Sequence, residues 1–172
     1  MSITKTLLRV TVGGLFVGHG LQKLTGSFDG PGLQGTEQMM GALDLHPARR
    51  QALAAAWTET AGGAALALGA ATPVAAAGLV GTMVTAVRKV HGSKGVWNTS
   101  GGFEYNAVLI AALAAFAESP GRASLDAAVG HRRWGLGGAA FALVAGGAAS
   151  YAITALSRRA APLAGRDTAA GE

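Results

Sequence analysis

Two long stretches without a charged residue limit most strongly what this chain can fold into. Residues 60–87 and 134–156 contain no Asp, Glu, Lys or Arg. A helix on the surface of a soluble protein needs a polar face, and neither stretch has one. A helix of about 20 apolar residues is long enough to cross the hydrocarbon core of a membrane. We therefore expect an all-α integral membrane protein rather than an Ala-rich soluble helical protein.

Composition and charge agree with a packed helical bundle in a lipid bilayer. Of the 172 residues, 50% are hydrophobic, 13% are charged and 27 are glycines. Small residues let helix backbones approach closely where lipid provides no hydrophobic force for helix association. The net charge is +5, but the basic residues flank apolar runs as membrane-end anchors do, so we expect no nucleic-acid partner. Cysteine is absent, which excludes disulfides, thiolate metal sites and thiol redox chemistry.

Apolar runs and the helix breakers between them predict five membrane spans. The expected spans are residues 6–24, 50–71, 73–90, 104–118 and 134–156, with a short interfacial helix at 36–43 and a Gly-rich loop at 92–103. A turn at Thr72-Pro73 divides the second and third spans, because Thr can cap a helix and Pro favours its first turn. The alternative is one long helix kinked at Pro73, which would remove a span.

Several ionisable residues lie inside the predicted spans. Arg9, His19 and Lys23 are in the first span, and Glu59 is in the second. An ionisable side chain within a bilayer costs at least ~2.5 kcal/mol unless a neighbour or water satisfies it. Because consecutive spans alternate in direction, His19 and Glu59 should differ in depth by only ~3 Å. We therefore expect a polar pocket inside the bundle, on the side of the loops at 25–51 and 92–103.

The candidate ligand-binding residues of this pocket come from four of the predicted helices and their ends. They are Arg9, His19, Lys23, Glu59, His91 and Glu104. Each has a structural alternative: Glu59 as half of a buried ion pair, Arg9 as a structural partner, and Glu104 as a first-turn carboxylate. Lys23 is also explained as an interfacial anchor.

Motifs for self-contained catalysis or metal binding are not found. The histidines and glutamates of the pocket provide nitrogen and oxygen donors, but without the short ligand spacing of a metal site, so none is predicted. A phosphate-cradling loop and a Ser–His–Asp signature are also missing from the sequence. The catalytic residues, if the chain has any activity of its own, are therefore not identified.

Several segments resemble the DoxX family of small bacterial membrane proteins: Arg9 followed by GGLFVGHGLQKL, FDGPGLQGT, WTETAGGAALALGAATP, GGFEYNAVLIAAL and SPGRASLD. The resemblance extends over about residues 5–126 and implies a four-helix membrane domain at 1–126. It also implies that the six candidate residues, together with Asp126, fall on family motif positions. Residues 127–157 would then be a linker and an added fifth span, and 158–172 a polar, disordered tail.

The resemblance also implies a class of function. The family includes relatives of the small membrane subunit of thiosulfate:quinone oxidoreductase, and mycobacterial members associated with a superoxide dismutase and a thiosulfate sulfurtransferase. By this likeness the chain is a subunit or accessory of a quinone-linked redox complex in the bacterial inner membrane, with other redox subunits as partners. No intrinsic cofactor is identified, and a quinone is the expected ligand, with a His19–Glu59 pair hydrogen-bonding its carbonyl group.

Two other functional classes stay open. In the first, the chain is a non-catalytic structural or assembly subunit that docks through its Gly-rich fifth helix, and a homo-oligomer is compatible with the same helix. In the second, the chain is a small-solute transporter, although it lacks the inverted repeat that such folds show.

Overall fold

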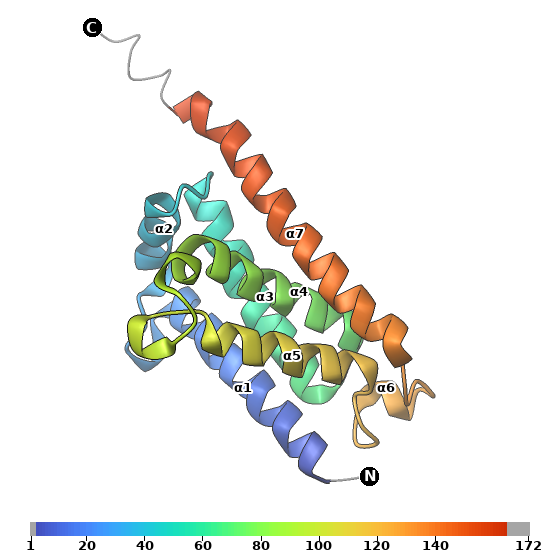
Figure 1. Ribbon diagram of the computed structural model, residues 1–172. Helices are drawn as coiled ribbons and strands as arrows, with labels where there is room; N and C mark the ends of the chain where they lie inside the picture. The colour runs from blue at the N-terminus through green and yellow to red at the C-terminus, as the bar shows by residue number, and fades with distance from the viewer. Residues whose placement is uncertain (1–2, 165–172) are drawn as a thin grey trace, which may run out of the picture.

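The computed structural model describes residues 3–164, and within them all regular secondary structure is helical (Figure 1). The long helices are α1 (Ile3–Thr25), α3 (Ala48–Leu68), α4 (Thr72–Ala86), α5 (Glu104–Glu118) and α7 (Gly135–Ala164). The shorter helices are α2 (Gly32–Ala42) and α6 (Leu125–Ala128), and α4 continues into a π-helical turn at Val87–His91. Short 3-10 turns lie at Ser27–Asp29, Gly92–Lys94 and Asn98–Ser100. The all-α class is confirmed.

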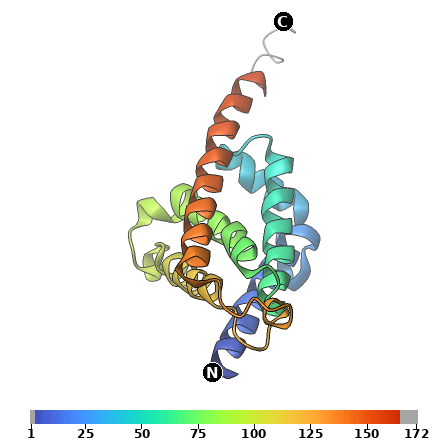
Figure 2. The same ribbon diagram turned by 90° about the vertical axis from the view of Figure 1, so that its right-hand side faces the viewer.

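The helices pack as a bundle with α4 near its centre. α1 packs mainly against α3, while α4 contacts α3, α5 and α7. The core between them is built from buried aliphatic and aromatic side chains, including Phe16, Leu79 and Phe116. Both views show α7 crossing the outside of the bundle and extending beyond it (Figures 1 and 2). The first turn of α1 and the last turn of α7 therefore lie at opposite ends of the molecule.

Glycines let two pairs of helix backbones touch. A Cβ atom on Gly13 of α1 would lie 2.6 Å from the carbonyl oxygen of Gly63 on α3. A Cβ atom on Gly146 of α7 would lie 2.6 Å from the carbonyl oxygen of Ala77 on α4. Both distances are shorter than van der Waals contact, so a larger side chain would force these helices apart. The close approach of backbones that composition predicts is present at these crossings.

The predicted turn before Pro73 is confirmed, and a single kinked helix is excluded. α3 ends at Leu68, Gly69 takes a left-handed conformation with φ 66°, and α4 starts at Thr72. Thr72 does not cap α4 as expected; instead its hydroxyl group donates a hydrogen bond to Asp126 Oδ2 at 2.7 Å. The turn is therefore held by a residue that lies far along the chain.

Two helices of the described chain are long and apolar enough to cross a membrane, Thr72–Lys94 and Gly135–Ala161. α1 and α3 have 23 and 21 residues but carry charged side chains, and α5 has 15 residues. That these three also cross the membrane stays a prediction. α7 continues beyond the expected end at Leu156 to Ala164, into the segment predicted to be a disordered tail, and residues 165–172 lie outside the described residues.

Arg9 holds together the end of the bundle at which α1 begins. Its side chain is only 2% exposed. Its guanidinium group donates hydrogen bonds to three backbone carbonyl groups: Pro120, Ala67 at 3.2 Å and Ala123 at 2.7 Å. A planar guanidinium with five N–H groups can satisfy several carbonyl groups at once. Arg9 therefore joins α1 to the end of α3 and to the segment after α5.

Asp126 is the acidic counterpart of Arg9 and lies close enough to attract it electrostatically. Its carboxylate accepts hydrogen bonds from Ala71 N at 2.7 Å, Thr72 N at 2.9 Å, the Thr72 hydroxyl group and Trp134 Nε1 at 3.3 Å. Burial by itself would raise the pKa of Asp126. The hydrogen bonds from Thr72, Ala71 and Trp134 outweigh it, so the pKa lies below its ordinary value. Asp126 thus connects the α3–α4 turn to the start of α7.

Candidate functional site

A cavity of about 560 Å³ lies between the helices, within the size range of small-molecule sites. Its wall includes residues of α1, α2, α3, α4, α5 and α7, together with the π turn and the loop after it. Four of the six sequence-predicted site residues line it: His19, Lys23, Glu59 and His91. The structure thus brings together side chains from α1, α3 and the end of α4, as their shared depth in the sequence suggested. Most of the remaining wall is aliphatic, aromatic or methionine side chains.

An ion pair between Lys23 and Glu59 forms part of the cavity wall. Lys23 Nζ on α1 donates to Glu59 Oε2 on α3, and the Glu59 side chain is 7% exposed. From the sequence, His19 was expected to be the partner of Glu59. Lys23 takes that place because it lies one helical turn further along the same face of α1, and its ammonium group can neutralise a buried carboxylate.

In both cavity histidines one ring nitrogen forms a hydrogen bond with another group of the protein. His91 Nδ1 lies 2.7 Å from the carbonyl oxygen of Gly101, which can only accept, so Nδ1 carries the proton. His19 is exposed at the cavity and its Nδ1 lies 3.1 Å from Gln22 Oε1. The Gln22 amide nitrogen faces the Phe28 carbonyl oxygen, so its oxygen accepts from His19. In the neutral state Nε2 of each histidine is therefore an acceptor, and no hydrogen bond engages it among residues 3–164.

Side chains of the π turn at Val87–His91 form hydrogen bonds with two segments beside the cavity. Lys89 Nζ donates to the carbonyl oxygen of Leu43, which follows α2, at 2.8 Å. His91 bonds Gly101 in the loop before α5. An extra residue in a helical turn changes which side chains face the interior of the bundle, and such π turns are frequent at functional sites. Here the turn brings Lys89 and His91 to the same wall.

Arg9 and Glu104 lie outside the cavity wall. Arg9 is ten residues before His19 in α1, a separation of ~15 Å along the helix, and it binds the carbonyl groups at the far end. Glu104 begins α5, and its Oε2 accepts a hydrogen bond from Asn98 N at 3.0 Å, which supports the loop. Within residues 3–164, no group of three His, Asp or Glu side chains is placed to hold a metal ion.

Asn106 and Lys89 line the cavity but were not among the predicted site residues. Asn106 is 8% exposed, and its Nδ2 lies 3.5 Å from Met83 Sδ. A polar residue two positions into the apolar α5 was the available signal. Lys89 looked like an interfacial anchor because it ends an apolar run, and only the fold shows it at the cavity.

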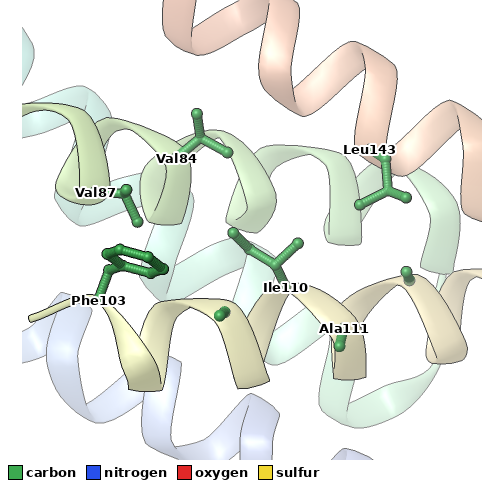
Figure 3. Close-up of a pocket in the computed structure, with 8 residues that line it drawn as sticks. Val84, Val87, Phe103, Ile110, Ala111 and Leu143 are labelled. Carbon is green, nitrogen blue, oxygen red and sulfur yellow. The ribbon is translucent and has the colours of Figure 1, made fainter. Parts of the chain in front are cut away.

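A second cavity, of about 470 Å³, lies between α4, α5 and α7 (Figure 3). In the close-up Phe103 and Val87 approach each other across it, and Ile110 points from α5 toward α4. The side chains that line it are aliphatic or aromatic throughout. It can therefore accommodate hydrocarbon but offers no side-chain hydrogen bond to a polar ligand.

Comparison with known proteins agrees with this architecture. The family model described as DoxX matches residues 4–92, slightly more than half of the chain. The chain belongs to the DoxX family. The match covers α1 to α4 and the π turn, and thus all four predicted residues that line the main cavity; it is shorter than the 5–126 expected from the sequence motifs. No curated protein and no solved structure matches the chain significantly. The chain is thus a DoxX family membrane protein in which α5, α6 and α7 lie outside the matched segment.

Proposed function

We propose that this protein is a membrane subunit or accessory of a quinone-linked redox complex in the bacterial cytoplasmic membrane. Its main cavity would hold a quinone headgroup or a similar small polar ligand. The observation that carries the proposal is the ion pair between Lys23 and the buried Glu59, which lies on the wall of a largely apolar cavity. An ion pair inside a membrane bundle is costly to keep without a role.

The cavity suits a ring that is apolar on its faces and polar at its edge. Phe16, Met40 and Leu109 provide apolar surface, while Glu59 and His91 provide hydrogen-bonding groups. A volume of about 560 Å³ is ample for a ring with short substituents. When bound, a quinone supplies carbonyl groups that take up electrons and protons. Lys23 Nζ can donate to a ring oxygen, and Glu59 and His91 Nε2 can each carry a proton beside it.

Electrons would come from a partner subunit. The sequence contains no cysteine, and no group of three metal-ligating side chains is found in the part of the chain that the structure describes. The role of these residues is then to bind, orient and exchange protons with the ligand, while another subunit supplies the redox centre.

Replacement of Glu59 by Gln tests the proposal. Glu59→Gln keeps the size of the side chain but removes its charge and leaves Lys23 without its partner. We expect quinone-dependent turnover of the native complex, or binding of a short-chain quinone by the purified protein, to fall by about tenfold or more. The measurement is quinone reduction by the isolated complex, with binding to the purified chain in nanodiscs as a second readout.

Glu37→Gln is the matched control. Glu37 pairs with Arg49 at 3.5 Å on the surface and does not line the cavity, so its replacement should leave quinone binding unchanged. Unchanged kinetics and affinity in Glu59→Gln, in a protein that is folded to the same extent as the control, would reject the proposal.

A structural or assembly role is the second candidate, and the outer face of α7 favours it. Leu136, Val144, Tyr151 and Leu156 are all exposed there, and Gly137 and Gly147 have open space above them. Such a face can contact another membrane helix as readily as lipid. Purification of the native complex distinguishes the two roles. A complex that keeps full activity after this chain is removed would support the structural role.

A further inference from the structure

Asn106 is a buried polar group of the main cavity whose hydrogen-bonding capacity is largely unused by the protein. It projects from α5, is 8% exposed and lines the cavity. Its hydrogen bond among the described residues runs from Nδ2 to the thioether of Met83 at 3.5 Å. A thioether is a weak acceptor, whereas a primary amide offers two N–H groups and a carbonyl oxygen. An amide buried with so weak a partner is unfavourable unless something else in the cavity binds it.

Several other polar groups of the wall already bond within the protein, and Asn98 and Tyr105, which also line the cavity, are exposed. Lys23 is paired with Glu59, and Lys89 donates to the carbonyl oxygen of Leu43. The hydroxyl group of Thr82 donates to a backbone carbonyl within its own helix. The two cavity histidines use their Nδ1–H groups on protein acceptors and, when neutral, present only an acceptor. Asn106 is thus a buried neutral donor that is available for a carbonyl oxygen of a ligand.

We propose that Asn106 determines the specificity of the cavity by donating a hydrogen bond to a ring oxygen of the bound ligand. This inference rests on the proposed function and names the side chain that recognises the polar edge of the ligand. Apolar side chains on three helices, Phe16, Met83 and Leu109, also line the cavity and can hold the faces of a ring. An analogue that lacks the ring oxygen would leave the buried amide without an acceptor, so the site should bind that analogue more weakly.

The test compares two ligands that differ only in their ring oxygens. Menadione is 2-methyl-1,4-naphthoquinone, and 2-methylnaphthalene has the same fused ring and methyl group but neither oxygen. Binding of both to the full chain in nanodiscs is measured against empty nanodiscs. We expect the wild type to prefer menadione by about tenfold or more. In Asn106→Leu, which has a similar volume, the preference should fall by about tenfold, while affinity for 2-methylnaphthalene is kept.

Gln38→Leu is the matched control, because Gln38 is exposed on α2 and does not line the cavity. The same amide-to-aliphatic change there should leave the preference intact. Infrared spectra of menadione labelled with ¹³C at its carbonyl groups provide a second readout. A carbonyl band shifted to lower frequency in the wild type should return toward its unbound position in Asn106→Leu. Asn106→Asp, which keeps the shape but removes the N–H donors, should show the same loss if the leucine variant does not fold.

The outcomes separate this inference from the proposed function. If menadione binds and Glu59→Gln weakens it, but neither Asn106 variant changes the preference or the carbonyl band, the role of Asn106 is rejected and the proposed function stands. If the wild type shows no preference for menadione over 2-methylnaphthalene, both are rejected.

Discussion

Replacement of Arg9 by Met should strongly destabilise the bundle without touching the main cavity. The long apolar methionine side chain fills much of the same space but donates no hydrogen bond. Three backbone carbonyl groups, those of Pro120, Ala67 and Ala123, would lose this partner, and that of Pro120 is buried. Asp126 would also lose the positive charge that attracts it.

The expected magnitude follows from these lost contacts. A buried polar group left without a partner costs about 1–3 kcal/mol, and removal of one member of a buried charge pair costs about 3–5 kcal/mol. The carbonyl groups share one donor side chain and can relax together, so the contributions will not add fully. We expect a loss of about 3–5 kcal/mol. At about 2–4 °C per kcal/mol for a chain of this size, the melting temperature should fall by about 10 °C.

The assay is thermal unfolding of the purified protein in detergent, followed by the helical circular dichroism signal. Arg49→Met is the control, since Arg49 forms an exposed ion pair with Glu37 whose loss should cost less than about 1 kcal/mol. Arg9→Lys should be intermediate, because one ammonium group reaches fewer carbonyl groups than a guanidinium. If Arg9→Met melts within about 2 °C of Arg49→Met, Arg9 is not the residue that holds this end of the bundle together.

Two further results are expected from the same melting assay. Because the pKa of Asp126 is lowered in the fold, its stabilising contribution is present above the ordinary carboxyl pKa of ~3.9 and is lost as the pH falls through the lower folded value. Asp126→Asn should therefore reduce the dependence of the melting temperature on pH below about 5; an unchanged acid profile would contradict the assignment. Gly13→Leu should destabilise the α1–α3 crossing by at least about 1–3 kcal/mol, since a Cβ atom there meets Gly63. Gly14→Leu, with open space above it, should change stability by less than about 0.5 kcal/mol; equal effects of the two would show that the crossing is not tight.

The sequence by itself determined the helical elements and the depth of the polar residues. The charge-free runs, the Thr72-Pro73 break and the Gly-rich loop led to helix positions close to those observed, and α5 spans the expected residues 104–118. A helix advances by a constant rise per residue, so distance along the chain converts directly into depth. That is why His19, Lys23, Glu59 and His91 were expected in one pocket, and they line one cavity.

Only the tertiary structure decided which of these groups touch. Rotation of a helix about its axis and the reach of a long side chain depend on packing against neighbours, and the rise per residue does not specify either. Glu59 therefore pairs with Lys23 and not with His19. Arg9 was among the predicted pocket residues, but its two terminal guanidinium nitrogens donate to carbonyl groups at the end of α3 and in the segment after α5. Those carbonyl groups belong to residues distant in sequence, and only folding places them around one guanidinium.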